Sequence, residues 1–201
     1  MNNQRGQDYR SIQPFSIDFD LISGLCASGR AKPTHRFVSN MVSQFNDRAA
    51  AEEIVKNGDL AIYDFYELDE IPETPGDLKF GTSIVYPGKV GNEYFMTKGH
   101  FHTILETGEV YYCLSGRGAM LMETPEGDVS LVEMKPGEAV YVPPRWAHRS
   151  INTGTETMVT FFVFRSDAGH DYGTIEQKGF RKLVVEQNGK PVMIDNPRWQ
   201  V

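Results

Sequence analysis

Hydrophobic and polar positions follow two different patterns along this chain of 201 residues. The first part is weakly patterned except for the stretch SQFNDRAAAEEIVKNGD, in which Phe45, Ala49 and Ile54 recur at roughly helical spacing. Because Asn57-Gly58 supplies a stop signal, we predict a helix at about residues 43–57, inside an N-terminal extension formed by residues 1–60.

The remainder of the chain, from about residue 60 to 201, has the pattern of strands separated by turns. Short β-branched and aromatic runs such as LAIYDFYEL and VTFFVF alternate with the turn sequences SGRG, PEGD, KPG and NTGT. Near the C-terminus, KLVVEQNGKPVMI predicts a hairpin built on Asn188-Gly189. Many short strands at regular spacing indicate a single all-β domain over residues 1–201, a sandwich or small barrel.

Composition and charge narrow the function. A net charge of −7 argues against binding to nucleic acids or anionic membranes, since both are polyanions. The longest apolar run is far too short to span a bilayer, and the polar opening MNNQRGQDYRSIQ is unlike a signal peptide. Cys26 and Cys113 lie far apart in the sequence, which suggests free thiols in a reducing cytoplasm.

Two of the five histidines, His100 and His102, lie one residue apart. On a strand such residues point to the same face, so their imidazoles can meet at one point. Glu109 follows on the next predicted strand, after a turn at Thr107-Gly108, and can reach the same point.

A fourth ligand is expected from another strand of the barrel. Gly137 and Pro143-Pro144 bracket a strand that we expect to deliver His148 to the interior. We therefore predict a divalent metal site formed by His100, His102, Glu109 and His148. The alternative is that His100 and His102 form a half-exposed polar pair with no ligand.

These spacings resemble those of the cupin superfamily and, within it, of the cupin-type phosphoglucose isomerases of archaea and some bacteria. That branch carries the motif P-x3-G-x-E-x3-T-x-G-H-x-H followed by E-x-Y, matched here from Pro87 to Tyr111. Its second motif, P-P-x3-H-x3-N, is matched from Pro143 to Asn152, and the tail DAGHDYGTIEQKGF is similar to the continuation of the family. The resemblance implies a cupin fold, a jelly-roll barrel also called a double-stranded β-helix.

The same resemblance implies a metal-dependent aldose–ketose isomerase that interconverts glucose 6-phosphate and fructose 6-phosphate in glycolysis and gluconeogenesis. It implies a cytoplasmic homodimer that uses Fe²⁺, with Mn²⁺, Ni²⁺ or Zn²⁺ as metals that the same ligands accept. Two other functions remain open. One is another metal-dependent cupin enzyme, a dioxygenase or decarboxylase, and the other is a non-catalytic cupin that binds a sugar phosphate.

The resemblance also assigns roles to individual side chains. It implies catalytic roles for Glu109, Tyr111 and His170, and substrate contacts from Ser83, Thr97, Gly99, Tyr111 and His170. Glu109 is the expected base for proton transfer between C1 and C2 of the sugar, and a hydride shift is the rival route. The Tyr111 hydroxyl and His170 would position the sugar or protonate an oxygen.

Two positions depart from the family pattern. Ser83 stands where a phosphate-binding threonine is expected, and this replacement keeps a hydroxyl. Phe164 stands where an active-site tyrosine is expected, and this replacement removes a hydroxyl. Lys98 and Arg165 are further candidates for the phosphate, with solvated surface charges as the alternative. Glu93 is a candidate to orient a ligand histidine.

Overall fold

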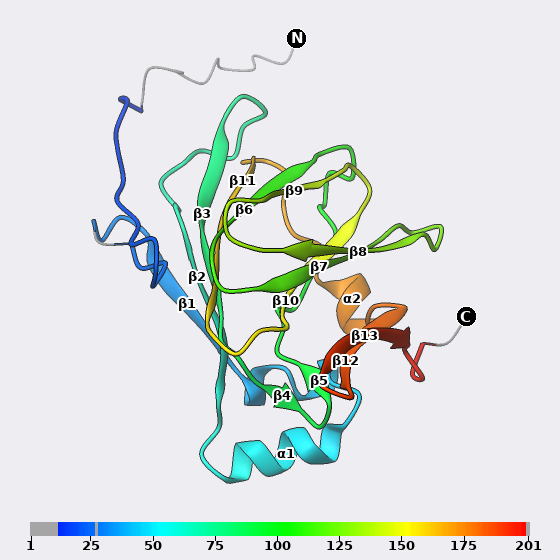
Figure 1. Ribbon diagram of the computed structural model, residues 1–201. Coiled ribbons are helices and arrows are strands. Elements are labelled where there is room, and N and C mark those ends of the chain that lie inside the picture. Colours follow the sequence, from blue (N-terminus) through cyan, green and yellow to red (C-terminus); the bar gives the residue numbers. More distant parts are fainter. Residues whose placement is uncertain (1–11, 27, 200–201) are drawn as a thin grey trace.

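The computed structural model describes residues 12–26 and 28–199, and most of its ordered elements are antiparallel strands arranged in three sheets (Figure 1). The largest sheet has the order β1-β2-β3-β11-β6-β9. In that order the strands are β1 (Lys32–Phe37), β2 (Ala61–Glu67), β3 (Leu78–Val85), β11 (Met158–Arg165), β6 (Glu109–Ser115) and β9 (Ala139–Val142).

Two smaller sheets complete the architecture. The first contains β10 (Ala147–Asn152), β7 (Gly118–Glu123) and β8 (Val129–Met134), in that order. The second contains β13 (Lys190–Asp195), β12 (Lys182–Gln187), β5 (Glu93–Tyr94) and β4 (Lys89–Val90). The α-helices in the described part of the chain are α1 (Arg48–Lys56) and α2 (Gly173–Lys178).

The six-stranded and three-stranded sheets share one apolar core. Burial on β6 alternates, so that Glu109 and Tyr111 point inward while Val110 and Tyr112 are exposed. Phe162 from the large sheet and Ile151 from the small one belong to the same buried cluster. The predicted all-β barrel is thus confirmed, and its interior is the place to which polar side chains such as Glu109 are directed.

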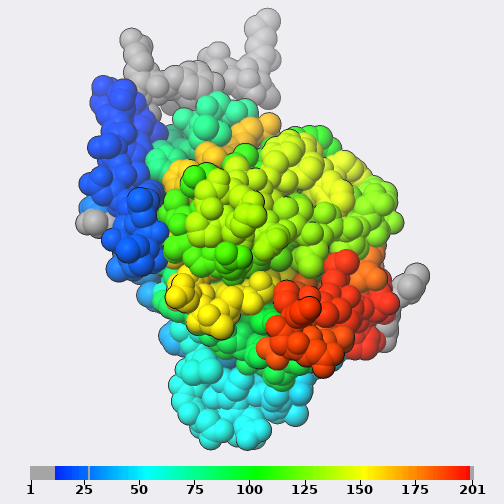
Figure 2. Space-filling model, in the orientation of Figure 1, coloured from blue at the N-terminus to red at the C-terminus, as the bar shows by residue number. Residues whose placement is uncertain are grey.

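The N-terminal extension is joined to the barrel more closely than its weak pattern suggests. β1 pairs along its length with β2, so it forms one edge of the large sheet. The segment before it covers the outer face of that sheet, where Phe15 and Phe19 pack against a buried cluster that includes Tyr66 (Figures 1 and 2). His35, expected in irregular structure, lies on β1 with its Nδ1 2.7 Å from Asp64 Oδ1.

The predicted helix exists but starts later than residue 43. Asp47 is the N-cap of α1, and its carboxylate accepts a hydrogen bond from the amide of Ala50. The residues before it form two 3-10 turns, Val38–Asn40 and Val42–Gln44. Phe45 is therefore buried ahead of the helix, and Ala49, which was expected on the apolar face, is exposed.

The C-terminal hairpin forms as predicted. β12 pairs with β13 in continuous register, and the turn residues Asn188 and Gly189 have φ values of 53° and 74°. Both values lie in the left-handed region that this turn requires. No helix in the described part of the chain is long and apolar enough to cross a membrane.

Candidate metal centre and active site

Four side chains from three segments converge inside the barrel. The possible ligand atoms of His100, His102, Glu109 and His148 all lie within 4.8 Å of one another. His102, Glu109 and His148 are only 4%, 3% and 2% exposed, and the Nε2 atom of His100 is also inaccessible to solvent. The prediction that these four residues meet is confirmed by this geometry.

The backbone that carries His100 and His102 is extended but is not a regular strand. It is attached to β10 by isolated bridges, one between His100 and His148 and one between Met96 and Ile151. His148 itself is the second residue of β10. The strand bracketed by Gly137 and Pro143-Pro144 is β9, and His148 reaches the interior from the next strand, after the turn that follows β9.

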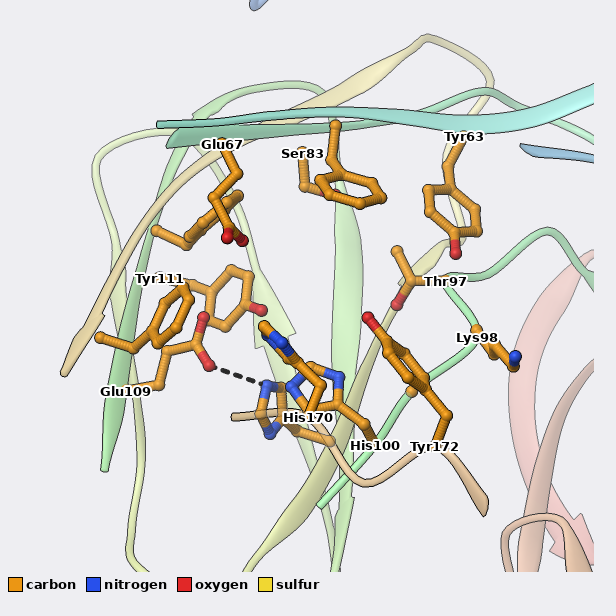
Figure 3. Close-up of a pocket in the computed structure, with 15 residues that line it drawn as sticks. Tyr63, Glu67, Ser83, Thr97, Lys98, His100, Glu109, Tyr111, His170 and Tyr172 are labelled. Carbon is orange, nitrogen blue, oxygen red and sulfur yellow. Dashed lines mark ion pairs between the residues drawn. The ribbon is translucent and has the colours of Figure 1, made fainter. Parts of the chain in front are cut away.

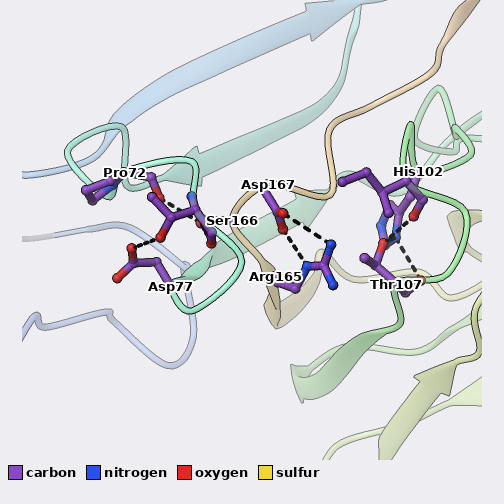
Figure 4. A network of polar contacts seen from close by, with 9 residues as sticks. Pro72, Asp77, His102, Thr107, Arg165, Ser166 and Asp167 are labelled. Carbon is purple, nitrogen blue, oxygen red and sulfur yellow. Dashed lines mark hydrogen bonds and ion pairs between the residues drawn. The ribbon is translucent and has the colours of Figure 1, made fainter. Parts of the chain in front are cut away.

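Hydrogen bonds fix the His102 ring in one tautomer (Figure 4). Its Nδ1 lies 2.7 Å from the Thr107 hydroxyl oxygen and 3.1 Å from the Thr107 carbonyl oxygen. The hydroxyl already donates to the Ile104 carbonyl, so both oxygens near Nδ1 are acceptors and Nδ1 carries the proton. The lone pair of Nε2 therefore points into the cluster, which is the arrangement that a metal ligand needs.

The carboxylate of Glu109 faces two imidazole nitrogens. Its Oε2 lies 3.1 Å from His102 Nε2 and 3.1 Å from His148 Nε2. His148 directs its Nδ1 to the Trp146 carbonyl at 3.4 Å, which again leaves the Nε2 lone pair for the cluster. Nitrogen lone pairs and a carboxylate that face one another in a buried space repel unless a cation lies between them, so this donor set fits a divalent metal ion.

The titration of the cluster is consistent with that arrangement. Burial lowers the pKa of His100 well below its ordinary value, and His148 and His170 lower it further, so His100 is neutral at pH 7. Burial raises the pKa of the Glu109 carboxyl, but the charge and hydrogen bonds of His148 and His102 lower it by more. The net effect holds the pKa of Glu109 below its ordinary range. A neutral imidazole and an ionised carboxylate are the forms that bind metal.

A cavity of about 180 Å³ opens above the cluster (Figure 3). This is room for several water molecules, each of which occupies about 30 Å³ in the liquid. Its walls include all the residues expected to contact substrate, namely Ser83, Thr97, Gly99, Tyr111 and His170. The sequence motifs thus lead to one cavity, although Ser83 comes from β3 and His170 from the loop after β11.

Hydroxyl and amide groups on one side of the cavity are suited to an anion. Ser83 Oγ is buried and has no hydrogen-bond partner in the described part of the chain. Thr97 Oγ1 accepts from the amide of Ser150 at 3.0 Å, which leaves its own proton free to donate. Gly99 has φ of +76°, and a Cβ there would lie 2.7 Å from the Phe180 ring, so only glycine fits this position.

Two further predicted residues lie directly beside the cluster. The ring of His170 packs against that of His100 with centroids 4.4 Å apart, and burial lowers its pKa to about 4. Burial and the adjacent Glu109 raise the pKa of Tyr111 well above its ordinary value, so its hydroxyl remains a donor. Phe164 is buried against His170, with ring centroids 5.3 Å apart.

Of three charged candidates, Glu93 and Arg165 lie outside the cavity wall, and Lys98 is part of it. Glu93 accepts a hydrogen bond from the Asn46 amide, and the charges that act on it are those of Arg149 and Arg198, so its contacts do not orient a candidate ligand histidine. Arg165 pairs with Asp167 and is absent from the cavity wall (Figure 4). Lys98 does line the cavity, where it pairs with Glu176.

Several residues of the cavity wall were not identified from the sequence. They are Tyr63, Phe65, Glu67, Phe162 and Tyr172. A signal for three of them was present, because Tyr63, Phe65 and Glu67 alternate on β2 and must share one face of the sheet. The sequence pattern identified that strand but not which of its faces meets the cavity.

Comparisons with known proteins agree with the motifs. The family model for Glucose-6-phosphate isomerase (GPI) matches residues 35–200. The chain is 48% identical over 189 residues to a glucose-6-phosphate isomerase of Thermococcus litoralis, covering 94% of this chain and 98% of that protein. It is 36% identical over 192 residues to one from Sinorhizobium medicae (strain WSM419), covering 94% and 89%. Among solved structures, a mutant of Bacillus subtilis oxalate decarboxylase has 24% identity and a TM-score of 0.41, covering 52% of this chain and 26% of that one.

Proposed function

The chain belongs to the glucose-6-phosphate isomerase family, in its cupin form, and on that premise we propose that it interconverts glucose 6-phosphate and fructose 6-phosphate. The observation that carries this proposal is the convergence of three imidazoles and one carboxylate beneath a cavity with hydroxyl groups in its wall. The metal ligands supply the reacting end of the site, and the hydroxyl groups supply the end that recognises the phosphate.

His100, His102, Glu109 and His148 would hold the metal ion. A divalent ion bound there supplies Lewis-acid chemistry, stabilising the negative charge that develops on O1 and O2 as hydrogen moves between C1 and C2. We favour Fe²⁺, although the same donors also accept Mn²⁺, Ni²⁺ and Zn²⁺. Thr107 supports the site by holding the His102 ring in the tautomer that presents Nε2.

The phosphate group would bind at Ser83, Thr97 and Gly99. The unpartnered Ser83 hydroxyl and the free proton of Thr97 are both donors, and the absence of a side chain at Gly99 permits close approach of its backbone. Tyr111 donates from the protonated phenol that burial maintains. The substitution of serine for the threonine of the family preserves the hydroxyl on which this binding depends.

One residue of the cluster and two beside it are assigned to the hydrogen transfer. Glu109 is the proposed base, and its depressed pKa makes it a weak one at neutral pH. Burial lowers the pKa of His170 to about 4, so the imidazole is neutral at pH 7. It can donate a hydrogen bond to a sugar oxygen or accept one from a sugar hydroxyl. Tyr111 is held beside Glu109 and can hydrogen-bond the oxygen that gains charge.

The function is tested by a coupled assay for glucose 6-phosphate formation from fructose 6-phosphate. Protein stripped by a chelator is reconstituted with Fe²⁺, Mn²⁺, Ni²⁺ or Zn²⁺ singly. We expect no activity in the stripped protein and recovery with at least one metal, Fe²⁺ being the most effective. Activity that survives exhaustive chelation contradicts the metal assignment, and inactivity with every metal contradicts the proposed reaction.

Cellular location and assembly are also proposed. Both cysteines are free, Cys113 being buried, which is typical of a protein in a reducing cytoplasm. We propose a homodimer because Val110, Tyr112 and Tyr141 are exposed on the outer face of β6 and the edge strand β9. Sedimentation equilibrium of the wild type and of Tyr141→Ser tests this assembly, since the loss of an apolar contact should weaken a dimer formed there.

A further inference from the structure

Glu67 is a carboxylate in the cavity wall to which the proposed reaction assigns no role. It is the last residue of β2, and its side chain is 16% exposed. Figure 3 shows its carboxylate directed into the cavity above Tyr111, on the side away from Thr97 and Lys98. Its charge also acts on Glu109, Tyr111 and Tyr172, which places it close to the reacting end of the site.

The environment of Glu67 keeps the carboxylate available. Lys79 Nζ lies 3.5 Å from Glu67 Oε1, but it makes its shorter hydrogen bond, 3.1 Å, to the exposed Glu73. Lys79 therefore compensates the charge of Glu67 without occupying the carboxylate fully. Burial raises the pKa of Glu67 and Lys79 opposes that effect, so the group is placed there at a cost in stability.

The part of the cavity wall that β11 contributes is apolar. Phe164 lies opposite Lys79 in the register of β11 and β3, and its ring lies beside that of Phe162, with centroids 6.0 Å apart and the ring planes tilted by 31°. The two phenylalanine rings offer no hydrogen-bond partner to the hydroxyl groups of a sugar bound against β11. Glu67 is the polar group at that position, and a carboxylate is a strong acceptor for hydroxyl donors.

We propose that Glu67 is a specificity-determining residue whose carboxylate accepts hydrogen bonds from hydroxyl groups of the bound sugar phosphate. The proposal rests on the proposed function, because it assumes that a sugar phosphate occupies this cavity. Glu67 recognises the sugar and not the phosphate, since a carboxylate repels an anion. It should therefore contribute to the binding of fructose 6-phosphate and not to that of inorganic phosphate.

The test compares Glu67→Met, which keeps a similar shape without an acceptor, with Glu73→Met, which removes the other, exposed partner of Lys79. In metal-loaded protein, we expect Glu67→Met to raise the KM for fructose 6-phosphate by about tenfold or more, the effect of losing a hydrogen bond to a charged group. The inhibition constant of inorganic phosphate should stay within about twofold of the wild type. Glu73→Met should behave as the wild type does, and Glu67→Gln, which retains one acceptor oxygen, should recover part of the loss.

Several outcomes would overturn the proposal. They are an unchanged KM in Glu67→Met, an equal rise in the KM and in the phosphate inhibition constant, and an equal effect in Glu73→Met. Circular dichroism and thermal unfolding establish that the variants are folded, and Glu67→Gln decides the question if the methionine variant is not. Wild-type protein that does not turn over fructose 6-phosphate with any metal instead contradicts the proposed function.

Discussion

His100 and His148 lie opposite each other across an isolated antiparallel bridge. The amide of His100 donates to the His148 carbonyl at 3.3 Å, and the amide of His148 donates back to the His100 carbonyl at 3.1 Å. This reciprocal pair brings the two imidazoles to a centroid distance of 4.6 Å. Two candidate metal ligands that are far apart in sequence are thereby positioned by main-chain hydrogen bonds.

Replacing His148 by glutamine should abolish tight metal binding, because it removes one of the four ligands. We expect close to one metal ion per chain in the wild type and much less in the variant, measured by mass spectrometry of the metal after dialysis. A ligand present at 100 times its Kd stabilises the native state by about 2.7 kcal/mol, so added metal should raise the Tm of the wild type and of the control variant below but not that of His148→Gln. His35→Gln, at an exposed histidine on β1, is the control; equal metal content in all three proteins contradicts the site.

Thr107→Val should weaken metal binding without removing a ligand. The hydroxyl of Thr107 holds His102 Nδ1 at 2.7 Å, and the loss of such orienting groups typically costs about 10- to 100-fold in metal affinity. Because the Thr107 carbonyl remains as an acceptor at 3.1 Å, we expect an effect near the lower end, about tenfold. Competition with a chelator measures the affinity. Thr155→Val, in an exposed turn, should leave it unchanged.

The stability of the metal-free protein should fall in mild acid because of His170. Burial lowers the folded-state pKa of His170 to about 4, below the unfolded value of about 6.5. The unfolded chain thus binds the proton first, so stability is lost as the pH falls from about 6.5 towards 4, by at most about 3 kcal/mol from this group. His100 acts in the same direction.

Urea unfolding of the chelator-treated protein at pH 7 and pH 4.5 measures this effect. His170→Gln should lose less stability than the wild type over the interval. The pKa of Glu109 is also depressed, so the ionised carboxylate stabilises the fold at every pH above its unfolded pKa of about 4.5. That contribution is lost only as the pH falls below about 4.5 towards the folded pKa. Burial raises the pKa of Glu67, Glu93 and Glu123, which therefore act in the opposite direction in this interval, but they are present in both proteins. The difference between the two proteins thus reports His170, and identical losses would count against its buried, neutral state.

Gly99→Ala should destabilise the fold more than Gly189→Ala does. Both glycines have positive φ, at +76° and +74°, so both variants carry a backbone strain of roughly 1 kcal/mol. Only at Gly99 does a Cβ meet other atoms, at 2.7 Å from the Phe180 ring and 3.0 Å from the His148 carbonyl oxygen. We expect an additional loss of about 1–3 kcal/mol there, measured by urea unfolding. Equal losses would show that the neighbours of Gly99 can move aside.

Isotope labelling distinguishes the two routes of hydrogen transfer. If Glu109 is the base, deuterium at C2 of glucose 6-phosphate should be lost at least in part to solvent water during turnover, because a proton on a carboxylate can exchange. Nuclear magnetic resonance of the product measures the deuterium that remains. Complete retention contradicts the role of Glu109 as base and supports a hydride shift, which the low pKa of this carboxylate would then help to explain.

The motifs in the sequence identified four side chains that converge in the structure, because candidate ligands recur at a characteristic spacing. The prediction was less accurate where the backbone departs from regular structure. His100 lies on an extended segment held by isolated bridges, and α1 starts at Arg48 because Asp47 caps it there. Such boundaries depend on single hydrogen bonds, whereas the hydrophobic pattern reports only the average burial of a segment.

The sequence by itself determined the all-β class, the C-terminal hairpin and the four candidate ligands, because alternation, turn residues and the spacing of histidine and glutamate are local properties of the chain. Only the tertiary structure decided which other side chains share the cavity. Glu67 and Phe164 come from strands far apart in sequence, and they meet there because the sheet places β2 and β11 on either side of β3. Strand order is set by long-range packing, and no local pattern encodes which faces will adjoin one cavity.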